Sequence, residues 1–368
     1  MKLLIIKIFI LCIKILYAPM KLRKAQNKIL YLSRQSNDKS TDMKMLEDEI
    51  RRISPETKQI FRLRRLKDES AITLSYIFSI FGDMWEMASS RVVVTDTYSI
   101  PVSCLRHKAE LQIVQIWHAM GAVKKFSLQA AGKAQGRDSG VAKAMHMHEN
   151  YTCVLAPSQE TGRVYCEAFG CDRSSLKILS LPRVDVILDG ADRKNEFVSL
   201  NPEFKGKEIV VYVPTFRKGD GDYAQLLHSA FSASKQKLVI SAHPLSEAAQ
   251  SGVYKFNGEF TSLDLMKLAD AVITDYSACA FEGALLNKPL YFYIPDYEQY
   301  RQEQGLNVDV ATVLPGTAFT DAGELAKNIS PENYDFKQLS VFADKYVENK
   351  KTNNTELLAS FICSLLEV

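Results

Sequence analysis

The sequence predicts an α/β fold with two doubly wound domains, each built on a parallel sheet with helices on both faces. The chain has 368 residues, and a single hydrophobic core usually stops growing below that length, so two domains are expected. Short apolar and β-branched runs alternate with helical patterns along the chain, which is typical of repeated strand–helix units. These runs are continuously apolar, as in parallel strands that are buried on both faces.

Residues 1–20 predict an amphipathic helix at a membrane surface. The segment is apolar, but Lys7 and Lys14 interrupt it, and Pro19 ends it before a basic cluster at 21–24. A membrane-spanning helix needs about twenty apolar residues with few charges, and a small-residue cleavage site of a secretory signal is absent. Lys7 and Lys14 are two helical turns apart, so they share one face, as in a helix lying in the cytoplasmic leaflet. The alternative is an ordinary helix docked on the protein itself.

The first domain is expected over residues 21–190. Its polar stretch at 36–70 has helical spacing and predicts solvated helices. A helix with Ser158 as its N-cap and Gly170 at its end follows a strand. The strands are predicted at 91–96, 111–117, 151–158 and 176–185.

Residues 190–207 are polar, lack periodicity and contain Pro and Gly, which predicts the linker between the domains. The second domain is expected over 205–335, and a helical segment at 336–368 could cross back onto the first. Its strands are predicted at 208–216, 237–244, 270–277 and 289–296, and its helices at 222–233, 262–269 and 278–288. Ligands of such sheets bind at the carboxyl ends of the strands.

Composition and charge exclude several classes of protein. The net charge is only +3, which argues against a nucleic-acid binder, because such proteins carry a strongly basic face. The seven cysteines are scattered and form no C-x-x-C pair, as expected of reduced thiols in the cytosol. His146 and His148 lie close in sequence, but a zinc site needs further ligands, so no metal site is predicted. The sequence identifies neither a magnesium requirement nor any other cofactor, and it leaves open a homo-oligomer.

Several polar side chains follow the ends of predicted strands. They are Trp117 and His118 in the first domain, and 215–217, 243–244 and 275–277 in the second. The helix after Ser277 would expose free N–H groups and partial positive charge, which suit a phosphate. Ser277 could cap that helix and donate to the anion as well. The alternative is a capped helix without a ligand.

Three of these second-domain residues also have ordinary interpretations. Arg217 could hold a diphosphate with its two-pronged guanidinium, or it could be a surface charge. Glu282 could meet a ribose hydroxyl or face solvent. His243, which precedes a proline, could be a structural histidine with satisfied hydrogen bonds.

Seven motifs occur in a specific order, and together they carry a resemblance to a known family. They are "QIWHAMGAVKKF", "VLAPSQETGRVYCEAFG", "LPRVD", "VPTFR", "AHP", "ITDYSACAFEGALLNKPLYFYIPDYEQY" and "LPGTAF". In this order they resemble the motifs of the CDP-glycerol glycerophosphotransferase family, the teichoic acid primases and polymerases of Gram-positive bacteria. The resemblance covers about residues 90 to 330. It implies a GT-B-like fold whose two domains face a cleft, with the donor in the second domain and membrane association without a full span.

The resemblance also implies a reaction and roles for the residues. An acceptor hydroxyl attacks the polyol-bearing phosphate of CDP-glycerol or CDP-ribitol, and CMP leaves. His118 is then the general base, a task that suits an imidazole with its ordinary pKa near 6.5, and His243 contacts the diphosphate or assists the leaving group. The residues implied to bind the donor are Thr215, Arg217, Pro244, Asp275, Ser277, Ala278 and Glu282. Those implied to bind the acceptor are Gly121, which lets the chain turn near the substrate, Lys124, Lys125 and Arg183.

The sequence departs from the family pattern at two places. Ala278 follows Ser277 where many members have a second serine, which removes one hydroxyl from the phosphate site. Ser180 stands at the first position of the motif G-x-P-R-x-D, so the turn before Arg183 is not the usual one.

The leading hypothesis is an enzyme that transfers glycerol phosphate, or a related polyol phosphate, from a CDP ester in teichoic acid or capsule synthesis. The acceptor would be an undecaprenyl-linked saccharide or a growing polyol-phosphate chain, at the cytoplasmic face of the cell membrane. The length of the chain favours a single addition. One alternative is a GT-B glycosyltransferase that uses a sugar nucleotide, and another is a non-catalytic, membrane-bound binder of polyanions.

Overall fold

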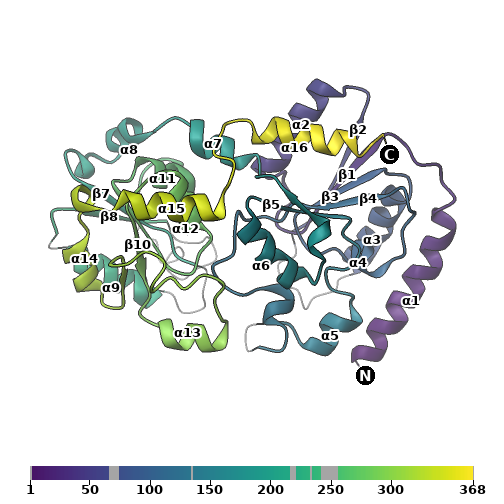
Figure 1. The fold of residues 1–368 in the computed structure, drawn as a ribbon, viewed down its shortest axis with the longest axis horizontal. Coiled ribbons are helices and arrows are strands. Elements are labelled where there is room, and N and C mark those ends of the chain that lie inside the picture. The colour runs from purple at the N-terminus through teal and green to yellow at the C-terminus, as the bar shows by residue number, and fades with distance from the viewer. Residues whose placement is uncertain are drawn as a thin grey trace. The chain divides into compact units, whose positions relative to one another are not determined.

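The computed structural model describes residues 2–65, 74–133, 136–215, 221–232, 234–241 and 256–367 (Figure 1). The chain divides into two compact units. Unit 1 consists of Met1–Met120, Phe126–Val186 and Lys351–Val368, and unit 2 of Gly121–Lys125 and Ile187–Lys350. Each unit contains one sheet, and all its neighbouring strands pair in parallel. The predicted α/β class with two parallel sheets is therefore confirmed.

The sheet of unit 1 has the strand order β2-β1-β3-β4-β5-β6. Its strands are β1 (Lys28–Ser33), β2 (Lys58–Leu63), β3 (Val92–Thr95), β4 (Gln112–Gln115), β5 (Cys153–Ala156) and β6 (Leu176–Ile178). Every residue of β1, β3 and β5 is buried, because helices cover both faces of a sheet that is formed by parallel strands. The carboxyl ends of these strands lie at one edge of the sheet, where ligands of this fold class bind.

The first two strands were not predicted from the sequence. β2 lies within residues 36–70, where the helical spacing predicted solvated helices, and that prediction holds only for α2 (Thr41–Ile53). β2 is the edge strand of the sheet and pairs along its whole length with β1. An edge strand keeps one side open to solvent, so it tolerates charged residues and lacks a continuous apolar run. The predicted strand at 176–185 is likewise only partly right, because β6 ends at Ile178 and a helix begins at Arg183.

Helices surround the sheet of unit 1. They are α1 (Lys2–Met20), α2, α3 (Leu74–Met87), α4 (Ile100–Cys104), α5 (Ser139–Ala144), α6 (Gln159–Phe169), α7 (Arg183–Asp189, at the boundary of the two units) and α16 (Asn354–Ser364), with short 3₁₀ turns at Ser127–Ala130 and Arg173–Ser175. α6 has the predicted caps: the Ser158 hydroxyl accepts from the Thr161 amide, and Gly170 ends the helix with φ 65°. Glycine adopts this left-handed conformation without a steric penalty.

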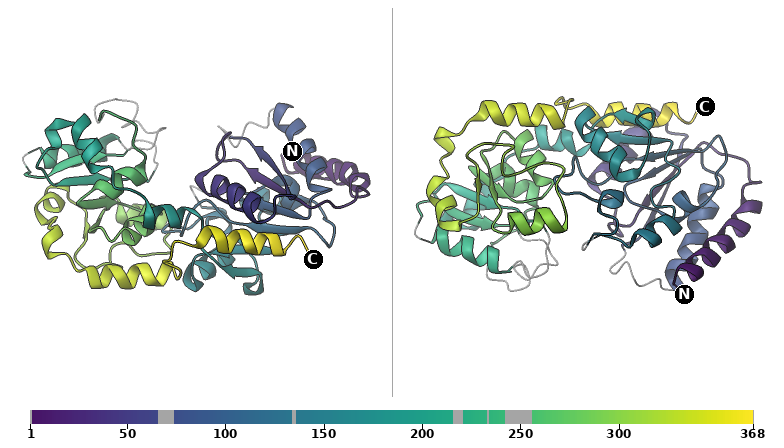
Figure 2. Two further views of the ribbon diagram at one scale, coloured as in Figure 1. Left: turned by 90° about the horizontal axis from the view of Figure 1, so that it is seen from above. Right: turned by 60° about the horizontal axis from the view of Figure 1, so that its bottom comes forward.

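The N-terminal helix α1 docks on unit 1 through one narrow stripe. Ile10, Ile13 and Tyr17 are buried, and α3 and α5 are its neighbours (Figure 2). Pro19 lies inside the helix, which ends at Met20 instead of at the proline. Most of the remaining apolar side chains of α1 are exposed. Among the described residues, α1 is the one helix long and apolar enough to cross a membrane, with a mean hydropathy of 2.2.

The sheet of unit 2 has the order β11-β10-β9-β7-β8. Its strands are β7 (Ile209–Tyr212), β8 (Lys237–Ile240), β9 (Ala271–Thr274), β10 (Leu290–Tyr293) and β11 (Ala318–Phe319). The helices described in this unit are α8 (Lys194–Leu200), α9 (Gly221–Phe231), α11 (Ser262–Leu268), α12 (Cys279–Leu285), α13 (Tyr297–Glu303), α14 (Ala322–Asn328) and α15 (Phe336–Tyr346), with 3₁₀ turns at Pro202–Phe204 and Pro331–Asn333. The core includes Val210, Leu227, Ile273 and Leu325, which are fully buried.

Residues 190–207, predicted as the linker, instead contain α8 and a 3₁₀ turn and belong to unit 2. Phe197 of α8 is fully buried, and its ring contacts those of Phe204, Phe256 and Phe260. This packing could not be predicted from the sequence, because α8 is short and the residues that flank it in the sequence are polar.

The last helix, α16, belongs to unit 1, whereas α15 belongs to unit 2. α16 packs against α2, and Asp185 fixes its first residues. The two carboxylate oxygens of Asp185 accept from the main-chain amides of Asn354 and Thr355, and also from the side chains of both residues, over 2.6–2.9 Å. Asp185 therefore satisfies amides at the start of α16 that have no partner within the helix.

Candidate functional site

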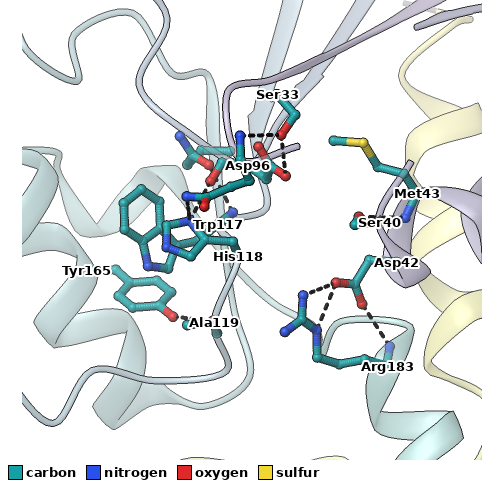
Figure 3. A network of polar contacts seen from close by, with 12 residues as sticks. Ser33, Ser40, Asp42, Met43, Asp96, Trp117, His118, Ala119, Tyr165 and Arg183 are labelled. Carbon is teal, nitrogen blue, oxygen red and sulfur yellow. Dashed lines mark hydrogen bonds and ion pairs between the residues drawn. The ribbon is translucent and has the colours of Figure 1, made fainter. Parts of the chain in front are cut away.

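His118 lies three residues beyond the end of β4, at the carboxyl edge of the unit 1 sheet, and it is half-buried (Figure 3). Its Nδ1 lies 3.0 Å from the main-chain oxygen of Asp96, which follows β3, the neighbouring strand. The side-chain amide of Gln35, just beyond β1, lies 3.2 Å from the same nitrogen. Three adjacent strand ends thus position one imidazole, as expected for a ligand site at this edge.

Two groups face Nδ1 of His118. The Asp96 carbonyl can only accept and is the nearer of the two, so we assign the hydrogen to Nδ1, which donates to it. The NH2 group of Gln35, at 3.2 Å, cannot donate to the same nitrogen in this tautomer. In the neutral imidazole the other nitrogen, Nε2, is then the basic one.

Trp117, next to His118, has an unusual backbone conformation. Its φ is 53°, in the left-handed region that costs a non-glycine residue about 1–2 kcal/mol. The side-chain oxygen of Gln115 accepts from the Trp117 amide at 2.9 Å, and the indole packs against Phe126 and Phe169. These contacts hold the turn that brings His118 to the sheet edge. Strained residues of this kind concentrate at functional sites.

Asp96 was not predicted as a site residue. The Ser33 hydroxyl donates to its Oδ2 at 3.0 Å, and its Oδ1 is buried without a hydrogen-bond partner in the part of the chain that the structure describes. Burial raises the pKa of Asp96 to about 6, and the negative charge of Asp42 adds to the rise. The signal that could have identified it is its position: it ends the predicted strand at 91–96, just as His118 follows the next one.

We expect replacement of Asp96 by asparagine to change how the stability of the protein depends on pH. The pKa of Asp96 is about 6 in the folded protein and about 4 when unfolded. Between these values the folded state binds more protons, so the free energy of unfolding falls as pH rises from 4 to 6 and is constant above. Asp96→Asn removes this fall, of which about 2 kcal/mol lies between pH 4.5 and pH 7.5. Urea unfolding of both proteins at these two pH values measures it.

The comparison between the two proteins is needed because Asp83 also titrates in this range. Burial raises the pKa of Asp83 to about 6 as well, but its contribution is present in both proteins and cancels in their difference. Parallel pH profiles for wild type and Asp96→Asn would show that Asp96 is ionised at all these pH values.

Arg183 has a structural partner. Its main-chain amide and its Nε each donate to the Asp42 carboxylate at 2.8 Å, and its Nη2 donates to the same group (Figure 3). Asp42 lies in the first turn of α2 and is only 1% exposed. Arg183 was predicted to bind the acceptor, whereas the contacts described here tie the start of α7 to the start of α2.

The other three predicted acceptor residues are grouped with unit 2 and not with the first domain. Lys124 and Lys125 pair through their main chain with residues 304–307. Gly121 is not among the residues with positive φ, so its turn does not require glycine for that reason. A Cβ at Gly121 would lie 2.5 Å from the ring of Phe281 in α12, so glycine is required here by close packing.

Two of the predicted donor residues are joined at the carboxyl edge of the unit 2 sheet. Asp275 follows β9, Thr215 follows the adjacent β7, and the Thr215 amide donates to Oδ1 of Asp275 at 2.8 Å. Asp275 is fully buried. The Thr215 hydroxyl is buried without a hydrogen-bond partner in the described residues. This pair is thus a built polar site that leaves one donor group for a further partner.

The start of α12 differs from the prediction. The helix begins at Cys279, and its N-cap is Ala278, which makes no side-chain cap. Ser277 lies one residue earlier, and its hydroxyl accepts from the Cys279 amide at 3.3 Å. Ser277, Ala278 and Glu282 are all half-buried. Between Asp275 and Ser277, the buried Tyr276 stacks on Tyr300 with the ring centroids 3.8 Å apart, which holds the loop in place.

Three further predictions lie outside the described residues: Arg217, His243 and Pro244. The remaining histidine pair of the sequence has ordinary roles. His148 is buried, its Nδ1 lies 2.8 Å from the Tyr151 hydroxyl, and burial lowers its pKa to about 3. His146 pairs with Glu149 at 2.9 Å. Within the described ranges, no group of three or more His, Cys, Asp or Glu side chains could hold a metal ion.

The chain is similar to known proteins over most of its length. The chain is 29% identical to the teichoic acid ribitol-phosphate primase of Bacillus spizizenii over 344 residues, which is 87% of this chain and 88% of the relative. It is 28% identical to the teichoic acid glycerol-phosphate primase of Bacillus subtilis, covering 76% of this chain and 75% of the relative.

The fold is that of a solved structure, the wall teichoic acid polymerase TagF. The two superpose with a TM-score of 0.71 at 16% identity, covering 95% of this chain and 93% of the other, and this confirms the predicted GT-B-like fold. The sequence profile of the CDP-glycerol:poly(glycerophosphate) glycerophosphotransferase family matches residues 16–364. Because the match extends over nearly the whole chain and includes every site residue described above, the protein belongs to this family of CDP-polyol phosphotransferases.

Proposed function

We propose that the protein transfers a polyol phosphate from a CDP-polyol to a hydroxyl group of a membrane-lipid-linked acceptor and releases CMP. The observation that carries this proposal is the family match over residues 16–364, together with the primases that the chain resembles. His118, held at a strand end with its Nδ1–H on the Asp96 carbonyl, supplies the base that such a reaction needs.

The reaction is a displacement at phosphorus. The acceptor oxygen attacks the phosphorus that bears the polyol, and the bond from this phosphorus to the bridging oxygen of CMP breaks. The hydroxyl proton passes to Nε2 of His118, and CMP leaves with the bridging oxygen. Negative charge develops on the leaving phosphate, so donors placed around it accelerate the reaction.

The donor side of the site is proposed in unit 2. Thr215 has a buried hydroxyl to donate to a phosphate oxygen, and Asp275 fixes the Thr215 backbone. Ser277 and the amide of Ala278 lie just beyond. Arg217, His243, Pro244 and Glu282 are proposed here on the family resemblance alone, and so are Lys124 and Lys125 for the acceptor.

A direct assay tests the proposal. The purified protein is incubated with a lipid-linked acceptor and with CDP-glycerol, CDP-ribitol or a UDP-sugar, and release of CMP or UDP is measured. We expect CMP from a CDP-polyol only when the acceptor is present. Release of UDP without CMP would instead identify a sugar-nucleotide glycosyltransferase. Donor binding without any release would identify a non-catalytic binder.

We further propose that α1 holds the protein on the cytoplasmic face of the membrane as a peripheral helix. Its outward stripe includes Leu4, Ile8, Leu11 and Ile15, which are 53–62% exposed and spaced on one helical face. Lys7 and Lys14 are exposed beside this stripe, where they can contact anionic headgroups. An exposed apolar stripe flanked by lysines is typical of helices that lie in the membrane interface.

Three substitutions on the outward stripe of α1 are expected to weaken membrane binding. Replacing Leu4, Ile8 and Ile15 with glutamine removes three apolar side chains, each worth roughly 1.5–3 kcal/mol when fully buried. We expect sedimentation with vesicles that contain anionic lipid to fall at least tenfold, with turnover of a soluble acceptor unchanged. Glutamine at three exposed apolar positions of unit 2, Leu200, Leu226 and Val341, is the matched control. Full sedimentation of the α1 variant would place the membrane contact elsewhere.

A further inference from the structure

We propose that a cavity in unit 1 binds a phosphate group of the acceptor, next to the hydroxyl that is activated by His118. This inference rests on the proposed function and names its acceptor more closely: a molecule that ends in a polyol phosphate. The cavity lies at the carboxyl ends of β1 and β2, beside α3. Its polar lining includes Ser33, Arg34, Arg62, Arg64, Tyr76 and Asp83.

The size of the cavity limits what it can hold. Its volume is about 180 Å³, and pockets for whole drug-sized ligands have about 300–1,000 Å³. A nucleotide is therefore too large, whereas a phosphate group with part of a polyol is of suitable size. The rest of the lining is partly apolar and includes Leu32, Phe61, Leu63 and Pro101, which could contact the carbon atoms of a polyol.

The residues that line the cavity carry a net positive charge, which favours the binding of an anion. Three guanidinium groups line the cavity, and among the described residues that line it Asp83 is the only one with a carboxylate. Asp83 accepts from Nε of Arg62 at 2.8 Å, so this one negative charge is paired with Arg62. Arg34 and Arg64 leave an excess of positive charge. Arginine presents several N–H donors in a planar fork that matches the oxygens of a phosphate.

Among the described residues, the side chains of Arg34 and Arg64 make few hydrogen bonds. Nη1 of Arg34 donates to the Tyr98 carbonyl at 3.2 Å, while Nε of Arg34 is buried without a partner among the described residues. Nη1 of Arg64 donates to the Ser75 carbonyl at 2.7 Å. A guanidinium has five N–H donors, and burying one without a partner costs free energy. A phosphate in the cavity would satisfy the Nε–H of Arg34.

The position of the cavity assigns it to the acceptor and not to the CDP donor. Ser33 lines the cavity and donates to Asp96, whose carbonyl holds His118. Gln35, the residue after Arg34, contacts His118 directly. The cavity and the base thus share the loop that follows β1. The proposed donor residues Thr215 and Asp275 belong to unit 2 instead.

Binding of small phosphates to the full-length protein tests the inference without any turnover. Calorimetric titration with inorganic phosphate and with glycerol 3-phosphate is carried out on wild type, Arg34→Gln, Arg64→Gln and Arg65→Gln. Arg65 is exposed and does not line the cavity, so its variant removes the same charge one residue away. We expect affinity to fall at least tenfold in the Arg34 and Arg64 variants and to stay within about twofold in Arg65→Gln.

The KM for the acceptor and the affinity for CDP distinguish a failure of this inference from a failure of the proposed function. Arg64→Gln should raise KM for a phosphate-ended acceptor at least tenfold and leave the affinity for CDP unchanged. Thermal unfolding identifies any variant that fails to fold, and Arg64, which makes one hydrogen bond here, provides the second test if Arg34→Gln is unstable. Unchanged phosphate affinity in a folded variant, an equal loss in Arg65→Gln or a matching loss of CDP affinity would overturn the inference. A lack of CMP release with all donors would overturn the proposed function, and with it the acceptor role of the cavity, but not the binding of phosphate there.

Discussion

Replacing His118 with asparagine is expected to lower the rate of CMP release by about 10²–10⁴-fold, the range that a general base contributes. In the wild type the Asp96 carbonyl accepts from Nδ1 of His118. The asparagine amide can still donate to this carbonyl, so the loop after β4 keeps its hydrogen bond to Asp96. What is lost is the basic nitrogen that takes the acceptor proton. We expect the affinity for the CDP donor to be unchanged, because the proposed donor residues lie in unit 2.

His146→Asn is the matched control for this experiment. His146 is a partly exposed histidine of the same unit, paired with Glu149, and its φ of 47° is one that asparagine tolerates well. Single-turnover CMP release, measured with donor and acceptor at saturation, compares the three proteins. Turnover of His118→Asn within threefold of wild type would exclude His118 as the base, as would an equal loss in His146→Asn.

The sequence predicts those parts of the fold that follow from local periodicity. The buried strands β3, β5, β7 and β9 are short runs of mostly apolar residues, and α6 carries its caps in the sequence. The strands could be predicted because a strand buried on both faces is mostly apolar along its length. This pattern is visible in the sequence without knowledge of the strand's neighbours. β2 was missed because its pairing with β1 is a tertiary interaction. Its charged residues Lys58 and Arg62 are four positions apart, a spacing that fits a helix as well as an edge strand.

That missed strand has a consequence for the site. Arg62 lies in β2 and Arg64 directly after it, and both line the phosphate cavity of unit 1. As long as residues 36–70 are interpreted as solvated helices, these arginines are surface charges. Once β2 is paired with β1, they lie at the carboxyl edge of the sheet, beside the loop that holds His118. Sheet pairing, and not the motif, brings them there.

The candidate site was predictable where a residue follows a strand. His118, Thr215 and Asp275 each occupy such a position, and each lies at the carboxyl edge of its sheet. The sequence could not show which of these residues are anchored by others. The hydrogen bond from Thr215 to Asp275 joins positions sixty residues apart, and such pairs have no local pattern.

The motif "LPRVD" shows how a family motif can hold a fold together. Arg183 binds Asp42 at the start of α2, and Asp185 binds the first amides of α16. α16 in turn packs against α2. Two charged residues of one short helix therefore join three helices that are far apart in the sequence. From the sequence alone, the arginine of this motif is more readily interpreted as a residue that binds the acceptor.

Replacing Asp42 with alanine is expected to lower the free energy of unfolding by about 3 kcal/mol, near the lower end of the range for breaking a buried ion pair. The Asp42 carboxylate is 1% exposed and accepts three hydrogen bonds from Arg183. Its removal leaves the Arg183 amide and guanidinium without these partners. Because the Arg183 side chain is 24% exposed, water compensates part of the loss. Asp42→Asn keeps an acceptor oxygen and should lose about half as much. Urea unfolding measures all three proteins.

Asp48→Ala on the same helix is the control for the Asp42 series. Asp48 is 74% exposed and pairs with Arg51 on the solvent side of α2, so its removal should cost less than about 1 kcal/mol. Arg183→Lys adds the test of acceptor binding. If Arg183 acts only through Asp42, this variant loses stability while KM for the acceptor stays within about twofold of wild type. A tenfold higher KM at unchanged stability would instead show that Arg183 binds the acceptor. The contact with Asp42 would then orient the Arg183 side chain.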